Sequence, residues 1–242
     1  MKFYQMFCAY YDNIFPFAGA KKSFFEKLLV DSTPAVALDL GAATGELTNW
    51  LASRGIMTTG VDLSEHLLNQ ARERQLPNAN FVLDDLLHYT ENTNQRYDLI
   101  VCIGNTLPHL RPAERKAWLD LLPSRLTPHG TLVIQTVNYT RILKEKPPGL
   151  AEIKREDPEL TFTRLYDYNH DGSITFTARL RTQEAGDSSA VTLWPFTAQE
   201  LINELPESLV PQIQYASFNQ TPYEPDQSPA WILVATCSGD DS

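Results

Sequence analysis

The fold is decided by the stretch Asp39-Leu40-Gly41-Ala42-Ala43-Thr44-Gly45, which ends an apolar run and precedes a helical segment that begins at Glu46. A short apolar run that ends at a glycine is typical of a buried strand. The two glycines allow unusual backbone angles and a close approach of the backbone to a ligand. The first N–H groups of the following helix suit a carboxylate or a phosphate. The stretch therefore predicts a strand, a ligand-binding loop and a helix, with a tight turn that binds no ligand as the alternative.

Apolar runs and helical patterns alternate on both sides of this loop. The expected helices span residues 3–14, 18–30, 46–54, 64–74, 113–126 and 197–205, and the expected core strands span residues 35–40, 57–61, 80–83, 97–103, 131–137, 213–218 and 231–236. A β-α-β-α order favours a parallel sheet that is covered by helices. The predicted fold class is therefore α/β, with a Rossmann-like, seven-stranded, mostly parallel sheet and helices on both of its faces.

The order changes after Tyr139. Residues 161–168 and 173–182 predict two antiparallel strands joined by the turn Asn169-His170-Asp171-Gly172, and residues 191–194 predict a third strand. We expect this β-hairpin element to be an insertion into the sheet domain. The predicted organisation is an N-terminal helical lid (1–30), a ligand-binding core (31–140), an inserted antiparallel substrate-roof element (141–195) and a C-terminal completion of the core sheet (196–242).

The composition narrows the function classes. The 242 residues carry a formal net charge of −10, and an acidic surface repels phosphate backbones, so no nucleic-acid partner is expected. No apolar run reaches the roughly 20 residues that span a bilayer, and no N-terminal signal is recognisable, so no membrane partner is expected. The cysteines at 8, 102 and 237 are odd in number and widely spaced. This spacing favours a reducing, cytoplasmic setting without a metal site. The sequence predicts no oligomeric state.

A second signal for a ligand is Asp62, in the segment Gly60-Val61-Asp62-Leu63-Ser64. It follows the glycine loop by about 20 residues, where sheets of this kind place a carboxylate that binds ribose hydroxyls. The alternative is that Asp62 caps the following helix. The loop does not match G-x-G-x-x-G, and this mismatch disfavours a nicotinamide dehydrogenase.

Five segments, in order, resemble the motifs of class I S-adenosylmethionine (SAM)-dependent methyltransferases. Residues 39–45 are similar to the motif D-L-G-C-G-T-G, with Ala43 in place of the middle glycine. Residues 60–64 and 81–86 resemble the second and third motifs, and residues 97–102 resemble the fourth strand. Residues 126–134 resemble the turn L-x-P-G-G-x-L-V-I, with His129 in place of a glycine. The resemblance implies SAM as the cofactor.

The same resemblance implies which residues hold the cofactor. They are Tyr11, Asp39, Gly41, Ala42, Gly45, Asp62, Leu63, Asp85, Leu86 and Ile103. Asp85 would accept a hydrogen bond from the adenine amino group, with Asp84 as the alternative. Tyr11 belongs to a segment that resembles Y-D-x-I-F, in which the tyrosine reaches over the cofactor. Its alternative role is aromatic packing.

Two further segments resemble glycine and sarcosine N-methyltransferases. Residues 104–110 are similar to G-N-S-x-x-H-L, and residues 137–139, followed by Pro-Pro-Gly at 147–149, are similar to R-N-Y-D and P-P-G. The resemblance implies that Asn105, His109, Asn138 and Tyr139 line the pocket of the methyl acceptor. The predicted catalytic residues are His109, Asn105 and Tyr139, with His109 as a general base, a positioning residue or a helix cap. Val137 and Thr140 replace an arginine and an aspartate, which disfavours glycine itself as the acceptor.

The inserted hairpin also carries Arg164, Arg179 and Arg181, and a guanidinium group suits an acceptor with a carboxylate. Strand alternation puts Arg179 and Arg181 on one face, which is a solvated face in the alternative interpretation. The predicted function is methyl transfer from SAM to a nitrogen or oxygen atom of a small molecule. Two alternatives remain: a methyltransferase that acts on RNA or protein, and a non-catalytic SAM-binding protein, for which the departures at Ala43 and His129 leave room.

Overall fold

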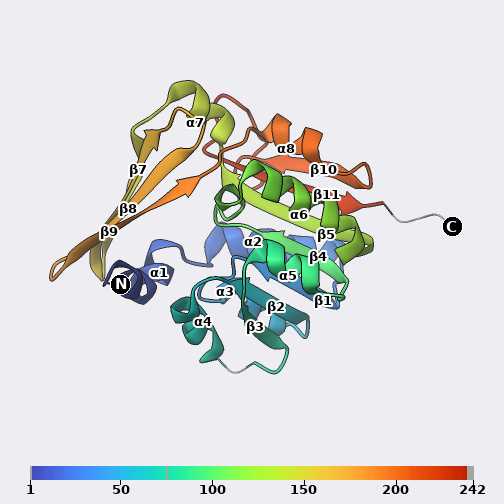
Figure 1. Ribbon diagram of the computed structural model, residues 1–242. Helices are drawn as coiled ribbons and strands as arrows, with labels where there is room; N and C mark the ends of the chain where they lie inside the picture. Colours follow the sequence, from blue (N-terminus) through green and yellow to red (C-terminus); the bar gives the residue numbers. More distant parts are fainter. Residues whose placement is uncertain (1, 75, 239–242) are drawn as a thin grey trace.

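Two β-sheets and the helices around them make up the computed structural model, which describes residues 2–74 and 76–238 (Figure 1). The helices are α1 (Lys2–Ile14), α2 (Gly19–Asp31), α3 (Glu46–Ala52), α4 (Glu65–Arg72), α5 (Leu86–Asn92), the 3-10 helix η1 (Leu107–His109), α6 (Pro112–Arg125), α7 (Tyr139–Glu145) and α8 (Ala198–Glu204). The strands are β1 (Val36–Leu40), β2 (Met57–Asp62), β3 (Ala79–Leu83), β4 (Tyr97–Cys102), β5 (Leu126–Val137), β6 (Gly149–Glu156), β7 (Glu159–Tyr168), β8 (Ile174–Thr182), β9 (Gly186–Leu193), β10 (Leu209–Tyr215) and β11 (Ala230–Cys237).

The larger sheet has seven strands in the order β10-β11-β5-β4-β1-β2-β3. Strands β1 to β5 pair in parallel, whereas β11 is antiparallel to both β5 and β10. This arrangement confirms the predicted fold class. The chain builds outward from β1 to β3 and then crosses back to place β4 on the other side of β1. The carboxyl ends of β1 and β4 therefore form a topological switch point, where sheets of this class bind ligands.

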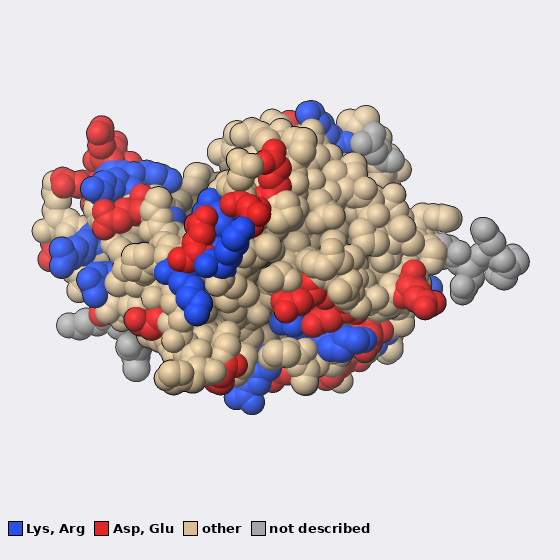
Figure 2. Space-filling view, turned by 90° about the horizontal axis from the view of Figure 1, so that it is seen from above, with Lys and Arg blue, Asp and Glu red and all other residues tan. Residues whose placement is uncertain are grey.

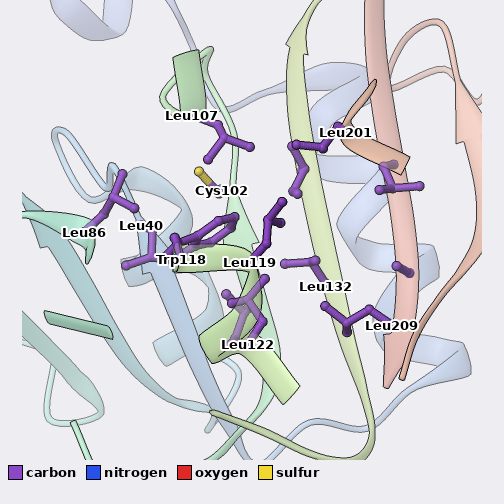
Figure 3. Packing of buried hydrophobic residues seen from close by; sticks show 14 of the residues in the cluster. Leu40, Leu86, Cys102, Leu107, Trp118, Leu119, Leu122, Leu132, Leu201 and Leu209 are labelled. Atoms are coloured by element: carbon purple, nitrogen blue, oxygen red, sulfur yellow. The ribbon is translucent and has the colours of Figure 1, made fainter. Parts of the chain in front are cut away.

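One face of this sheet is covered by α5, α6 and α8. Figure 3 shows Trp118, Leu119 and Leu122 of α6 pointing toward Leu132 of β5, with Cys102 of β4 nearby, and all five side chains are fully buried. The helix begins at Pro112, a residue that suits a first turn. Truncation of such a buried leucine to alanine typically costs about 2–5 kcal/mol, so this packing holds β4 and β5 in place at the switch point.

The other face is covered by α2 and α3. Phe24 and Phe25 of α2 and Leu51 of α3 pack in one cluster with Val101 of β4 and Val133 of β5. The two helices frame the loop after β1, because α2 ends just before this strand and α3 begins just after the loop. No helix in the described part of the chain is long and apolar enough to cross a membrane.

The insertion forms a separate four-stranded antiparallel sheet in the order β6-β7-β8-β9. Figure 1 shows this sheet beside the larger one, with α1 next to β8 and β9. The predicted hairpin is confirmed, since Tyr168 pairs with Ile174 and the Asn169 N–H donates to the Ser173 carbonyl over 2.9 Å. Phe7 of α1 stacks on Phe162 of β7 with ring centroids 5.6 Å apart, so the first helix and the insertion share a core.

The sequence patterns underestimate this insertion. β6 and most of β9 were not expected, because their side chains are mostly polar and at least partly exposed, which weakens an apolar strand pattern. Helices α5 and α7 were also not expected. Each has seven residues, too few for a clear helical period.

Candidate cofactor and acceptor site

Three cavities meet at the loop after β1, and Gly41 lines all of them. The first, here called the roofed cavity, measures about 280 Å³ and lies between α1, the smaller sheet and the loop after β4. The second, the Lys21 cavity, measures about 290 Å³ and extends toward α2. The third, the Asp85 cavity, measures about 730 Å³ and lies along the first turns of α4 and α5. Their arrangement provides room for one elongated ligand and a neighbouring smaller one.

The glycines of the loop are required by its shape. Gly41 has φ +81°, and a Cβ atom there would lie 2.3 Å from Thr106 Oγ1. Gly45 has φ +68°, and a Cβ atom there would lie 2.6 Å from both Ala71 and Phe81. Only glycine accommodates both the left-handed backbone and this lack of space.

The two departures from the methyltransferase motifs keep the backbone that a glycine would take. Ala43 has φ +49° and His129 has φ +63°. A left-handed residue with a Cβ atom costs roughly 1–2 kcal/mol. At Ala43 a hydrogen bond stabilises this conformation, since its N–H donates to Asp62 Oδ2 over 2.9 Å. The alanine therefore adds one methyl group to the loop while its backbone takes the left-handed conformation that glycine favours.

Asp62 lies at the end of β2 and lines both the roofed cavity and the Asp85 cavity. Its carboxylate accepts from the N–H groups of Ala43 and Ser64, the latter over 2.8 Å. Burial raises the pKa of this carboxyl group. Each carboxylate oxygen has a second lone pair, so two acceptor positions remain for ribose hydroxyls. The cap of α4 is Ser64, whose side chain accepts from the Leu67 N–H over 3.4 Å.

Asp84 and Asp85 both line the Asp85 cavity. Asp85 is the cap of α5, since its Oδ1 atom accepts from the N–H groups of Leu87 and His88 over 2.9 and 3.2 Å. Asp84 accepts from the ring of His88 over 2.8 Å. The predicted contact of Asp85 with adenine stays a prediction. Two further candidates line the same cavity: Leu63, which is 72% exposed, and the buried Leu86.

Lys21 is a site residue that the sequence patterns did not indicate, because it stands beside Lys22 in a helix with no other sign of function. It lines the second cavity together with Asp12 and Asp39. Burial lowers its pKa, while the charges of Asp39 and Asp12 oppose that change. Burial also raises the pKa of Asp39 to about 6, although the hydroxyl of Thr48 donates to it over 2.7 Å. The cavity thus holds a partly buried cation with acidic neighbours.

Among the other cofactor candidates, Ala42 and Ile103 line the Lys21 cavity. Tyr11 lines both this cavity and the roofed cavity. It also packs edge to face on Phe7, with ring centroids 5.3 Å apart, so it has the aromatic contacts of its alternative role as well. A hydrogen bond links α1 to the loop after β1, since the Thr44 hydroxyl donates to Asp12 over 2.5 Å.

The three predicted catalytic residues do not all reach a cavity. Asn105 and His109 line the roofed cavity, whereas Tyr139 is buried behind Asn105 and lines none of the three cavities. Asn105 donates to Tyr139 Oη over 3.0 Å and accepts from the Val137 N–H over 3.2 Å. His109 is exposed as a residue. The protein atoms around its ring nevertheless reduce the hydration of the charged form and lower the pKa of the ring below the usual 6.5. A neutral imidazole therefore faces the roofed cavity at pH 7.

Asn138 does not line the acceptor pocket, contrary to what the resemblance implied, but has a structural role. Its side chain is buried and donates to the carbonyls of Pro225 and Ser228 over 2.7 and 2.9 Å. It also accepts from the hydroxyl of Tyr223 over 2.9 Å. Asn138 thus anchors the loop before β11 and lines none of the three cavities.

Comparison with known proteins agrees with this geometry. A family model described as a methyltransferase domain matches residues 37–130. A ubiquinone biosynthesis O-methyltransferase of Coxiella burnetii is 34% identical over 104 residues, which cover 42% of this chain and 43% of that protein. A glycine/sarcosine N-methyltransferase of Aphanothece halophytica is 30% identical over 134 residues, which cover 53% and 50%. The chain thus matches half or less of the length of these relatives.

Solved structures match over nearly the whole chain. An S-adenosylmethionine-dependent methyltransferase from Clostridium acetobutylicum has a TM-score of 0.77 and 19% identity, and covers 98% of this chain and 99% of its own. The CcbJ methyltransferase from Streptomyces caelestis has a TM-score of 0.76 and 20% identity, with 96% of each chain covered. The smaller sheet is therefore part of a shared fold. Residues 37–130 thus match a methyltransferase domain, and the whole chain shares the fold of solved SAM-dependent methyltransferases.

Proposed function

We propose that this protein transfers a methyl group from SAM to a nitrogen or oxygen atom of a small molecule. The observation that carries the proposal is the roofed cavity, which adjoins the glycine loop and measures about 280 Å³. Ligand pockets for small molecules typically measure about 300–1,000 Å³. α1 and the smaller sheet close this cavity on the side away from the loop, so a large acceptor has little room beside the cofactor.

The residues present fit SAM. Gly41 lines all three cavities without a side chain, and the unpaired acceptor positions of Asp62 suit two ribose hydroxyls. Asp85 and Leu86 line the neighbouring cavity, where a flat base fits. In the opposite direction, Lys21 offers a partly buried cation that suits the carboxylate of the methionine part.

When bound, SAM supplies an electrophilic methyl group on a positively charged sulfur. The chain's own task is to orient the acceptor, exclude water and remove a proton where the acceptor needs it. Asn105 is held by two hydrogen bonds and forms a rigid wall of the cavity. His109 is neutral at pH 7 because its pKa is lowered, so its ring can accept a proton from an acceptor hydroxyl or ammonium group. Tyr11, Phe7 and Phe15 cover the cavity with aromatic rings and limit the access of water.

The charge distribution favours a small acceptor over RNA. The face in Figure 2 mixes Lys and Arg with Asp and Glu and has no continuous basic band. Arg164 is the only lysine or arginine among the described residues that line the roofed cavity. Binding to nucleic acid depends on several cations that contact phosphates, and the mouth of this cavity lacks such a set.

The proposal is tested by calorimetry with SAM, followed by a screen of amines, amino acids and hydroxylated metabolites for the product S-adenosylhomocysteine. We expect SAM to bind and at least one class of small molecule to be methylated. Failure to bind SAM at millimolar concentration would refute the proposal. Transfer of labelled methyl groups only into RNA or protein would refute the small-molecule acceptor.

A further inference from the structure

Two residues of β7 that line the roofed cavity each have a buried polar atom without a partner. The two groups are the Nε–H of Arg164 and the hydroxyl of Tyr166, and neither has a hydrogen-bond partner in the described part of the chain. Tyr166 is only 4% exposed. The two residues are two positions apart on one strand, so their side chains lie on the same face. Both line the cavity, and buried polar groups of this kind normally have partners.

Arg164 is held in place by one of its other nitrogen atoms. Its Nη2 donates to the Ala151 carbonyl of β6 over 2.7 Å, whereas its Nε has no hydrogen-bond partner in the described part of the chain. Burial lowers its pKa, but an arginine keeps its charge in proteins. No ion pair to Arg164 is present among the described residues. The roof of the cavity therefore presents a fixed, unpaired positive charge beside a free hydroxyl donor.

The rest of the wall near Arg164 is apolar. The rings of Phe7, Phe162 and Phe176 line the cavity, together with the side chains of Leu150 and Val191. Asp62 also lines it, but its carboxylate already accepts from two N–H groups at the opposite, loop side. A ligand that fills this space needs an apolar body and one group that accepts two hydrogen bonds from the roof.

We propose that the methyl acceptor is a small carboxylic acid with an apolar body, whose carboxylate binds Arg164 and Tyr166. This inference rests on the proposed function and names the class of its acceptor. One carboxylate oxygen accepts from the Nε–H and the other from the hydroxyl, because a carboxylate accepts strong, charge-assisted hydrogen bonds from a guanidinium N–H and can accept a second bond at its other oxygen. The apolar body lies against the phenylalanine rings, with the nucleophilic atom on the side of Asn105 and His109.

A competing role for Arg164 is to bind the carboxylate of SAM itself, because Arg164 also lines the Lys21 cavity. Lys21 is on the α2 side of that cavity beside Asp39, whereas the free Nε of Arg164 is on the strand that roofs the acceptor space. We therefore assign Lys21 to the cofactor and Arg164 to the acceptor. The two roles predict different losses when Arg164 is changed.

The test is a titration of the full chain, saturated with S-adenosylhomocysteine, with benzoate and phenylacetate and with the neutral amides benzamide and phenylacetamide. We expect each carboxylate to bind at least tenfold more tightly than its amide. Arg164→Gln should abolish this preference, and Tyr166→Phe should weaken carboxylate binding severalfold. Arg179→Gln is the matched control, because Arg179 lies on the neighbouring strand β8 and is exposed. The ratio of carboxylate affinity to amide affinity in Arg179→Gln should equal that of the wild type.

The affinity for S-adenosylhomocysteine is measured in every variant and reports both on folding and on the competing role. It should stay unchanged in Arg164→Gln. Equal binding of acids and amides, binding of none of the probes, or a loss of S-adenosylhomocysteine binding in Arg164→Gln would each overturn the inference. Failure of the proposed function looks different, because methyl transfer would be absent while S-adenosylhomocysteine binding and the carboxylate preference stay in place.

Discussion

The cofactor loop and the roof of the acceptor cavity use polar groups in opposite ways. At the loop, Asp62 and Asp39 already accept hydrogen bonds from the chain itself, and Asp12 ties α1 to Thr44. At the roof, Arg164 and Tyr166 leave polar atoms without partners in the described part of the chain. The loop is thus assembled before any ligand arrives. The roof retains unsatisfied donors that a ligand can satisfy, and specificity for an acceptor can therefore reside there.

The largest effect is expected from Gly41→Ala, which tests whether the loop is as rigid as its contacts indicate. The new Cβ atom would meet Thr106 Oγ1 at 2.3 Å in a left-handed backbone. Strain and overpacking together should lower the free energy of unfolding by about 2–4 kcal/mol. SAM affinity, measured by calorimetry, should fall by about 30-fold to 700-fold if the same 2–4 kcal/mol of distortion is lost from binding.

Gly55→Ala is the matched control for this change. Gly55 has φ +84°, but a Cβ atom there would have nothing within 4 Å. Only backbone strain of about 1 kcal/mol should appear in urea unfolding, with SAM affinity unchanged. Equal losses in the two variants would show that backbone strain, and not the contact with Thr106, explains the need for Gly41.

His109→Gln tests whether His109, which lines the roofed cavity, acts as a general base. The pKa of His109 is lowered, so the ring is neutral at pH 7 and gains its proton only as the pH falls below about 6.5. The wild-type rate should therefore decline on the acid side of pH 6.5. The variant should be about 100-fold slower and should lack that decline, as expected for loss of a general base.

The measurement is the single-turnover rate between pH 5 and 9 with the best acceptor from the screen. His170→Gln, in the exposed turn between β7 and β8, is the control and should keep the wild-type profile. A slower His109 variant that retains the acid-side decline would indicate a positioning role instead of proton removal.

Asp85→Ser and Asp84→Ser decide which acidic residue of the third motif contacts adenine. Serine is a good helix cap, so the first change keeps α5 while removing the longer carboxylate. We expect SAM affinity to fall by about tenfold in Asp85→Ser, the value of one hydrogen bond to a charged group, and to change little in Asp84→Ser. The opposite ranking in calorimetry would assign the contact to Asp84.

The smallest expected effect is a difference in stability between two variants, one that removes a tyrosine hydroxyl with a hydrogen-bond partner and one that removes a tyrosine hydroxyl without a partner. Tyr166→Phe removes a buried hydroxyl without a partner and should raise the free energy of unfolding by about 1 kcal/mol. Tyr139→Phe removes a hydroxyl that accepts from Asn105 and should lower it by about 1 kcal/mol. Urea unfolding without ligand measures both values. A loss of stability in Tyr166→Phe would show that this hydroxyl already has a favourable contact in the free protein.

The local patterns predicted the core well and the site in part. They located the strand before Asp39, the loop glycines and Asp62, because these features depend on short-range apolar runs and turns. The resemblance to glycine and sarcosine N-methyltransferases implied Asn105 and His109 in the acceptor pocket, and both line the roofed cavity. The local patterns and the resemblance did not, however, locate every residue. They did not find Lys21, and the implied place of Asn138 in the acceptor pocket was wrong. The contacts of both residues come from distant segments, which no local pattern contains.

The sequence by itself determined the class of fold and its ligand loop, since glycine, apolar runs and helix caps act within a few residues of one another. It also indicated that an antiparallel element follows Tyr139. Only the tertiary structure decided that this element is a four-stranded sheet that shares a core with α1. It also decided that Arg164 and Tyr166 face the same cavity as the loop after β4. The physical reason is that burial and missing hydrogen-bond partners arise from contacts between segments far apart in the chain.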